Sequence, residues 1–437
     1  MSYVGPVALS AFVAVSALVA ADARFAASPE SLPPLGAEFL VNSSTPGPQG
    51  RPAVAATPEG RFLVVWETLA DGLYEIRGRL FSPDGIALGV DFPVSEATAA
   101  SQSWPDAAAG GAGEFIVAWD SREVDGSGVG IAARRLDRDG NPLGGEFAVN
   151  TDVVGDQTRP RIAASSQSQF VVAWRNDAAP GGTDISARLF TLGGLPKGDE
   201  FVVNSLTSAS QIAPAVAMAP DGSFVVTWMS EGADGDGYGV RARQFSANGG
   251  PFGEEFGLND VTTGYQGMPA IEWLAGGRYL AVWVSCEAGD FGCEVRARSV
   301  ERAAPVLSDE HAVGAFNPVS LHWPRIAPRP DGRAVITWDG DQGDGAALGV
   351  LAAVVDGGGL PLTAEEVVNE YLTGDQFRAD LGINGPGYLL VAWQCENGDD
   401  SSYGIRGRAF SCGIYCDGFE SGDTLRWSRP AGEVQAQ

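Results

Sequence analysis

Arginine and tryptophan side chains stand at one equivalent position in several repeated segments, and their chemistry suits ligand binding. Each precedes the central portion of a short strand, usually directly before a proline. These residues are Arg51, Trp104, Arg159, Trp323 and Arg378, with Ala213 and Met268 at the same position in the two remaining segments. Guanidinium groups donate paired hydrogen bonds to carboxylates, and aromatic rings provide stacking surfaces. We therefore predict that this ring binds a glycan or a protein ligand. The same side chains could instead only cap the packing between segments.

Three carboxylates offer a second chemistry. Glu272 stands where the other segments have alanine or glycine. Asp106 and Asp380 share a position that is occupied by Arg161 and Arg325 in other segments, so these four charges could pair across neighbouring segments. Two carboxyl groups can act as acid and base on a glycosidic bond. A carbohydrate-active hydrolase or lyase is therefore the alternative to a binding protein, with these three residues as candidates and no catalytic residue assigned. Two histidines are too few for a multi-histidine metal site.

Acidic, glycine-rich loops follow the repeated tryptophans. Their carboxylates include Asp234, Asp236, Asp339, Asp341 and Asp344. Ca²⁺ takes six to eight oxygen ligands in flexible geometry, so it is the one cofactor that these loops suggest. None of the loops has the EF-hand spacing, because the terminal glutamate is missing. The simpler interpretation is that they are solvated turns, for which Asp and Gly are also selected.

The cysteines indicate an oxidising compartment. Cys286 and Cys293 are seven residues apart within one acidic loop and are predicted to form a disulfide. Cys395, Cys412 and Cys416 leave an odd remainder, from which one further pair is expected.

A repeat of about 54 residues must position all of these side chains. It is marked by tryptophans at 66, 119, 174, 228, 283, 338 and 393. Each copy has four strand-sized pieces, which in the first copy are residues 38–42, 53–56, 62–66 and 76–81. Four short strands per repeat are what one blade of a β-propeller requires. The sequence therefore predicts an all-β, seven-bladed propeller of four-stranded antiparallel blades.

The phase of the repeat predicts how this propeller closes. The chain begins with the E-F-x-V-N element at residues 38–42, and the last copy ends at residues 405–410 without a further such element. If this element is the outermost strand, the first copy must complete the last blade. We predict that residues 37–42 pair with residues 405–410, which hides edges that would otherwise be exposed.

Residues present in nearly every copy are interpreted as structural. The tryptophans are expected to pack between blades, and an arginine 13 to 15 residues later is expected to pair with a nearby carboxylate or carbonyl. A glutamine 17 residues before each tryptophan, and an asparagine seven residues before that glutamine, are expected to satisfy backbone groups in the crossover.

The segment from Phe224 to Phe245 resembles F-V-V-x-W-x-S-x-G-x-D-G-x-G-Y-G-I-x-x-R-x-F-D repeats, which are common in large secreted and surface proteins of bacteria. The resemblance covers nearly the whole mature chain. It implies a propeller of unknown ligand and brings no catalytic motif. The tail at residues 416–428 is similar to F-E-S-G-D-x-x-x-W segments that end some exported bacterial proteins, and this likeness assigns it no role.

Composition and charge complete the prediction. The 437 residues carry a net charge of −27, which argues against nucleic acid and anionic membrane surfaces as partners. An apolar run at residues 7–21, too short to span a bilayer, ends in a cleavage-site pattern. We predict a signal peptide at 1–23, a linker at 24–35, the propeller at 36–411 and a cysteine-containing tail at 412–437. The expected product is a secreted, extracellular or periplasmic, monomeric binding or adhesion module without membrane insertion.

Overall fold

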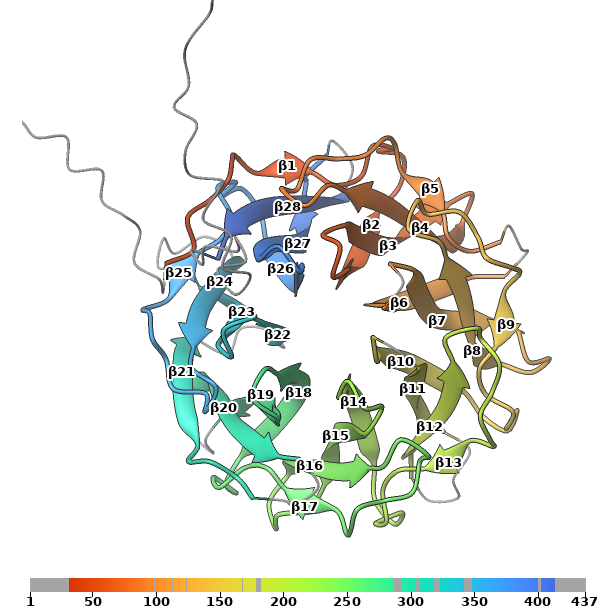
Figure 1. The fold of residues 1–437 in the computed structure, drawn as a ribbon, viewed down its shortest axis with the longest axis vertical. Coiled ribbons are helices and arrows are strands. Elements are labelled where there is room, and N and C mark those ends of the chain that lie inside the picture. The colour runs from red at the N-terminus through yellow and green to blue at the C-terminus, as the bar shows by residue number, and fades with distance from the viewer. Residues whose placement is uncertain are drawn as a thin grey trace, which may run out of the picture.

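The computed structural model describes residues 31–96, 100–111, 113–122, 124–166, 168–177, 182–286, 292–302, 306–316, 323–341, 348–399 and 402–412. Figure 1 shows seven sheets arranged around a central axis, and each sheet contains four antiparallel strands. Every helix or strand assigned within these ranges is a strand, and none of them holds a helix long and apolar enough to cross a membrane. The predicted seven-bladed propeller is confirmed.

The strands of each blade follow one another outward from the axis. The innermost strands are β2 (Gln49–Ala56), β6 (Gln102–Ala109), β10 (Gln157–Ala164), β14 (Gln211–Met218), β18 (Tyr265–Leu274), β22 (Arg325–Pro328) and β26 (Gln376–Ile383). The second strands are β3 (Phe62–Ala70), β7 (Phe115–Arg122), β11 (Gln169–Asn176), β15 (Phe224–Glu231), β19 (Arg278–Cys286), β23 (Ala334–Asp341) and β27 (Tyr388–Glu396).

The two outer positions have the same order around the ring. The third strands are β4 (Leu73–Phe81), β8 (Val129–Leu136), β12 (Asp184–Thr191), β16 (Tyr238–Phe245), β20 (Cys293–Glu301), β24 (Leu348–Val355) and β28 (Tyr403–Ser411). The outermost strands are β5 (Phe92–Pro93), β9 (Phe147–Ala148), β13 (Phe201–Val202), β17 (Phe256–Gly257), β21 (His311–Phe316), β25 (Glu366–Val367) and β1 (Phe39–Leu40).

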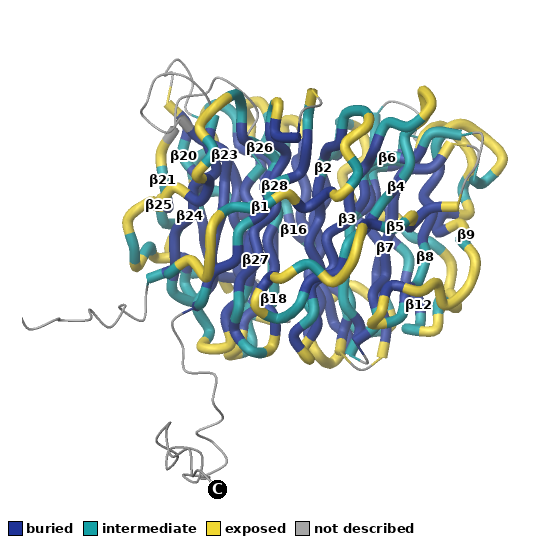
Figure 2. Tube along the Cα trace, turned by 90° about the horizontal axis from the view of Figure 1, so that it is seen from above, coloured by how far each residue is buried: buried dark blue, intermediate teal, exposed yellow. Residues whose placement is uncertain are grey.

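The core lies between the blades. The second strands are rich in β-branched and aromatic residues and are buried on both faces, as in β15, where only the last residue is exposed. All seven repeated tryptophans are fully buried. In the fourth blade, Trp228 Nε1 donates a hydrogen bond to Gln211 Oε1 over 2.8 Å. Figure 2 shows the buried strands at the centre of the ring and the exposed residues on loops at both ends.

The repeated arginines and asparagines tie neighbouring strands together, as predicted. Arg243 Nη1 donates to the carbonyl of Val203 in the preceding blade over 2.9 Å, and Asn259 Oδ1 accepts the backbone N–H of Val240 over 2.8 Å. The same arginine contact to the preceding outer strand is made by Arg79, Arg134, Arg188, Arg298 and Arg408. These contacts confirm that the most regular residues of the repeat are structural.

The predicted closure of the ring is also confirmed. Strand β1 pairs with β28, with Phe39 opposite Gly407 and Leu40 opposite Arg406. The preceding segment continues along this edge, because Pro34 forms a bridge with Phe410 and the Leu35 N–H donates to the Ala409 carbonyl over 2.9 Å. The end of the segment expected to be a linker therefore belongs to the last blade. The predicted signal peptide and residues 413–437 of the predicted tail lie outside the described residues.

Candidate functional site

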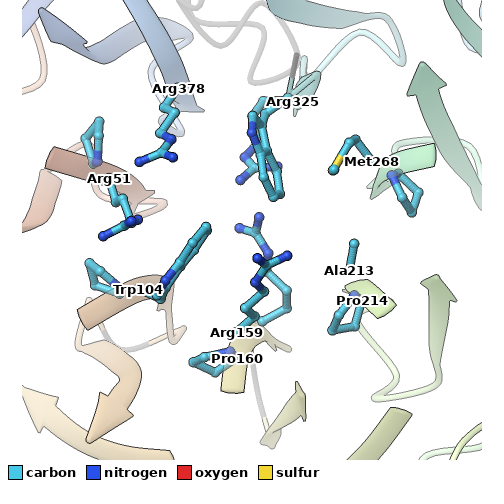
Figure 3. A pocket seen from close by; sticks show the side chains of 14 residues that line it. Arg51, Trp104, Arg159, Pro160, Ala213, Pro214, Met268, Arg325 and Arg378 are labelled. Atoms are coloured by element: carbon cyan, nitrogen blue, oxygen red, sulfur yellow. The ribbon is translucent and has the colours of Figure 1, made fainter. Parts of the chain in front are cut away.

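The ring residues predicted to bind a ligand lie together at one end of the central channel. Arg51, Trp104, Arg159, Trp323 and Arg378 line a funnel of about 670 Å³ that is open to solvent, and Ala213 and Met268 line it as well. Figure 3 shows Arg378, Arg51, Trp104 and Arg159 following one another around one side of this opening. This region, lined by the seven ring residues and their neighbours, is called the channel mouth below.

A β-bulge in the innermost strand aims each ring residue at the channel mouth. In β2 the register shifts between Gly50 and Ala53, so that the strand has one residue more than its partner. Arg51, which lies in this bulge, has a φ of 52°. The other ring residues whose φ is given have values between 51° and 57°, and these are Trp104, Arg159, Ala213, Met268 and Arg378. The last blade keeps this conformation although Ala379 replaces the proline that follows in the other blades.

Side chains from the preceding blade stabilise these left-handed bulges. The backbone N–H of Arg159 donates to Asp120 Oδ1 over 2.7 Å, and that of Arg378 donates to Asp339 Oδ2 over 3.0 Å. Trp104 N–H donates to Glu67 Oε2 over 3.2 Å. Each acceptor directly follows the repeated tryptophan of its blade. Sequence reasoning missed this role, although an acid directly after the tryptophan was a visible signal.

These buried acids sit behind a cluster of positive charge. Burial raises the pKa of Glu67 and, more strongly, that of Asp120. Burial also raises the pKa of Asp339 to about 7, while the N–H groups of Arg378 and Ala379 oppose the shift. The carboxylates therefore hold the backbone of the ring, and only Glu67 also forms an ion pair with a ring arginine, Arg51.

Three guanidinium groups gather around Trp104. Their central carbons lie 4.3 Å (Arg51), 4.7 Å (Arg159) and 5.6 Å (Arg378) from the ring centroid. Trp323 approaches Trp104 at 5.9 Å between centroids. Among the described residues, no carboxylate lies within ion-pairing distance of Arg159 or Arg378. The expectation of an open aromatic stacking surface therefore needs correction at Trp104, whose ring is engaged by arginines through cation–π contacts.

The carboxylates predicted as catalytic candidates meet in a second cavity farther along the channel. Glu272, Asp106 and Asp380 line this space of about 530 Å³ together with Arg161 and Arg325. The two arginines also line the channel mouth. They therefore stand between the mouth and the three carboxylates.

The predicted pairing of charges across neighbouring blades is confirmed. Arg161 Nη1 lies 3.5 Å from Asp106 Oδ1, and Arg325 Nε lies 3.2 Å from Asp380 Oδ1. Each aspartate also accepts a backbone N–H from the next blade, Asp106 from Ile162 over 2.9 Å and Asp380 from Val54 over 2.7 Å. Both aspartates thus have structural partners.

The third carboxylate, Glu272, has no ion pair among the described residues. Burial raises the pKa of Glu272 to about 8, and the nearby carboxylates of Asp380 and Asp106 add to the shift. Burial also raises the pKa of Asp380 to about 6, against the opposing charge of Arg325. At neutral pH the cavity therefore contains a protonated glutamic acid beside an ionised aspartate.

The acidic residues predicted as calcium ligands do not gather in one place. Asp339 lies in strand β23 and holds the bulge of Arg378, which corrects its assignment to a loop. Asp234 Oδ2 accepts Asn259 Nδ2 over 2.8 Å, and Asp236 Oδ2 accepts the Gly264 N–H over 3.1 Å. Asp341 ends β23, and Asp344 lies outside the described residues. Within those residues, no three His, Cys, Asp or Glu side chains are arranged to hold a metal ion.

Calcium binding by the acidic loops stays a prediction with a direct test. A bound ion stabilises the folded state in proportion to its occupancy. If the loops bind calcium, the thermal midpoint measured in calcium exceeds the midpoint in chelator, and magnesium at equal ionic strength serves as the control. An unchanged midpoint would remove calcium from the description of this protein.

The predicted disulfide is present. Cys286 and Cys293 are joined with an S–S distance of 1.98 Å, and they connect the end of β19 to the start of β20. Cys395 and Cys412 are buried in the core of the last blade, and Cys416 lies outside the described residues. A second pairing among these three stays a prediction.

Comparison with known proteins supports the fold alone. No protein-family model and no curated protein sequence matches this chain. A protein of unknown function from Dyadobacter fermentans aligns over 87% of this chain and 99% of its own, with a TM-score of 0.51 and 9% identity. The α-L-arabinofuranosidase ARB93A from Fusarium graminearum aligns over 87% and 99%, with a TM-score of 0.49 and 10% identity.

An α-L-arabinanase from Penicillium chrysogenum gives a TM-score of 0.47 at 12% identity, over 86% of this chain and 98% of its own. Similarity this low in sequence says nothing about a shared ligand or reaction. The two scores below 0.5 carry no argument about this chain. The likeness to the Dyadobacter protein agrees with the propeller architecture, and any statement about function must come from the channel mouth itself.

Proposed function

We propose that this protein is an exported binding module that captures the acidic group of a glycan or a peptide at the channel mouth. The observation that carries the proposal is the group of three guanidiniums around Trp104, two of which have no carboxylate within ion-pairing distance among the described residues. Guanidinium groups in this arrangement can donate several hydrogen bonds to one anion.

The charge of the whole chain strengthens this argument. A protein with 55 acidic and 28 basic residues has ample carboxylates with which to neutralise three arginines. The acids nearest the channel mouth, Asp120 and Asp339, instead accept backbone N–H groups. The guanidiniums of Arg159 and Arg378 are thereby left available to a ligand from outside.

The proposal predicts selective binding of anions. In a panel of glycans and peptides, we expect the members with carboxylate or sulfate groups to bind and the neutral members not to bind. Arg159→Gln and Arg378→Gln should each weaken binding at least tenfold, which is about 1.4 kcal/mol. Arg138→Gln, in an exposed turn at the opposite end of the blades, is the matched control and should change the affinity less than twofold. Binding of neutral glycans that is insensitive to both mouth variants would contradict the proposal.

A second candidate is hydrolysis or elimination at an acidic glycan. It is favoured by the protonated Glu272 that shares a cavity with the ionised Asp380, because glycosidases use one carboxyl group in each state. It ranks second because Asp380 and Asp106 already have structural partners. Product analysis of the glycans that bind separates the two functions, since an enzyme releases shorter fragments and loses this release in Glu272→Gln while still binding.

Export remains part of the proposal. Its support is the apolar run at residues 7–21, the cysteine pair and the resemblance to repeats of secreted bacterial proteins.

A further inference from the structure

The channel mouth has two chemically different halves. Arg378, Arg51, Trp104 and Arg159 come from four consecutive blades and form the cationic half. Ala213 and Met268 come from the next two blades and form an apolar half, which Figure 3 shows on the opposite side of the opening.

The apolar half is the end of a core cluster that reaches the channel. Ala213 and Met268 belong to the same buried cluster as Met229, and Trp323 packs against that cluster. In this half, Met229 takes the position that holds an acid behind Trp104, Arg159 and Arg378. The difference between the halves therefore extends from the ring residues into the layer behind them.

The side chains that line the mouth can donate hydrogen bonds but hardly accept them. Among the described lining residues the polar side chains are arginines and tryptophans, and there is no carboxylate, amide or hydroxyl. Arginine and tryptophan have no side-chain acceptor. A sugar hydroxyl placed here would lose its acceptor in water without replacement, which costs binding free energy. A carboxylate only accepts and has no such cost.

The floor of the mouth limits how a ligand enters. Arg161 and Arg325 stand at the floor and are held by their ion pairs with Asp106 and Asp380. One end of a ligand can reach the free guanidiniums, whereas a chain cannot continue past these ion pairs without breaking them. The mouth therefore suits a terminal group.

We infer that the channel mouth binds a terminal carboxylate that is attached directly to an apolar body. The carboxylate contacts Arg159 and Arg378, and the apolar body packs against Ala213 and Met268. Two sources share this chemistry, a free aromatic or branched aliphatic acid and the C-terminal residue of a peptide with an apolar side chain. The inference rests on the proposed anion site and narrows its ligand to a class that excludes sugar acids.

The test compares carboxylates with different bodies on the intact mature protein. The probes are 3-phenylpropionate, the dipeptide N-acetyl-Ala-Phe with a free carboxylate, the same dipeptide as an amide, and glucuronate. In calorimetric titrations, we expect an apolar carboxylate to bind at least tenfold more tightly than glucuronate, and the amide not to bind. Equal affinity for the first two probes identifies a free acid as sufficient, whereas preference for the dipeptide identifies a peptide C-terminus.

Variants of the two halves separate the contributions. Ala213→Asn adds an amide to the apolar wall, and asparagine tolerates the left-handed backbone found there. It should weaken the apolar carboxylate at least fivefold. Met268→Gln is a second variant with the same expectation, and the thermal midpoint of each shows that it is folded. Arg378→Gln should weaken every carboxylate.

Each contrary result has a defined meaning. If glucuronate binds as tightly as 3-phenylpropionate and Arg378→Gln weakens both, the apolar-body inference fails while the anion site stands. If Arg378→Gln changes the affinity of none of the carboxylates, the proposed function fails as well. Apolar carboxylates that bind Ala213→Asn and Met268→Gln unchanged would also overturn the inference.

Discussion

Replacing Val41 with aspartate should destabilise the whole propeller, whereas the same replacement at the adjacent Leu40 should have little effect. Val41 is fully buried, and its N–H donates to the Ile405 carbonyl over 2.8 Å. It belongs to a core cluster that joins the last blade to the first. An unpaired carboxylate at this position costs about 3–5 kcal/mol of unfolding free energy, by comparison with other uncompensated buried charges.

The neighbouring residue provides a matched control. Leu40 lies on the same strand but is 38% exposed, so an aspartate there remains solvated. Its expected effect is within about 0.5 kcal/mol. Denaturant unfolding of the two variants measures the difference. Equal, small effects would mean that the last blade is stable without the N-terminal strand, and the ring closure would then be a contact of little energetic importance.

The reason for the large expected effect is the position of the strand in the chain. Every other blade is built from consecutive residues, but β1 is separated from β28 by more than 360 residues (Phe39 opposite Gly407). In repeat proteins each unit is stabilised chiefly by its neighbours. A ring that cannot close leaves the faces of the first and last blades exposed, so the damage extends beyond one strand.

Sequence reasoning could predict this closure because it depends on the order of elements along the chain. The period gave the number of blades, and the missing last E-F-x-V-N element gave the partner of residues 37–42. The ring of residues at the channel mouth was predictable for the same reason, since equivalent positions of a closed array face the same axis. Arg161 with Asp106, and Arg325 with Asp380, likewise occupy equivalent positions in adjacent blades.

Contacts that depend on side-chain direction could not be predicted. Three arginines from different blades surround Trp104, and neither their spacing nor their type shows that they engage a ring expected to stack with a ligand. Glu67, Asp120 and Asp339 accept backbone N–H groups of the following blade, and such bonds leave little trace in the partner's residue type. The meeting of Glu272 with Asp106 and Asp380 depends on the width of the channel, which the repeat length does not give.

Glu272 should make the stability of this protein fall as the pH rises from about 4.5 to about 8. The ordinary pKa of a glutamate is 4.5, and burial beside Asp380 and Asp106 raises the pKa of Glu272 to about 8. Between these values the folded state keeps a proton that the unfolded chain has released. The free energy of unfolding therefore decreases with rising pH, by at most about 1.4 kcal/mol per pH unit from this group.

A glutamine variant isolates this contribution from other groups. The raised pKa values of Asp380 and Asp339, about 6 and about 7, give the same direction in the wild type, so the wild-type curve alone cannot assign the effect. Glu272→Gln cannot ionise. Its stability relative to the wild type should grow from pH 5 to pH 8 and level off above pH 8, when Glu272 is ionised in both the folded and the unfolded states.

Thermal midpoints measured across this pH range provide the test, with Glu365→Gln as the control in an exposed turn. The control should follow the wild-type curve in parallel. If Glu272→Gln also ran parallel to the wild type, Glu272 would be ionised at neutral pH and compensated by Arg325 or Arg161. The protonated acid required by the hydrolase alternative would then be missing, so the same measurement decides between the two candidate functions from the side of the channel carboxylates.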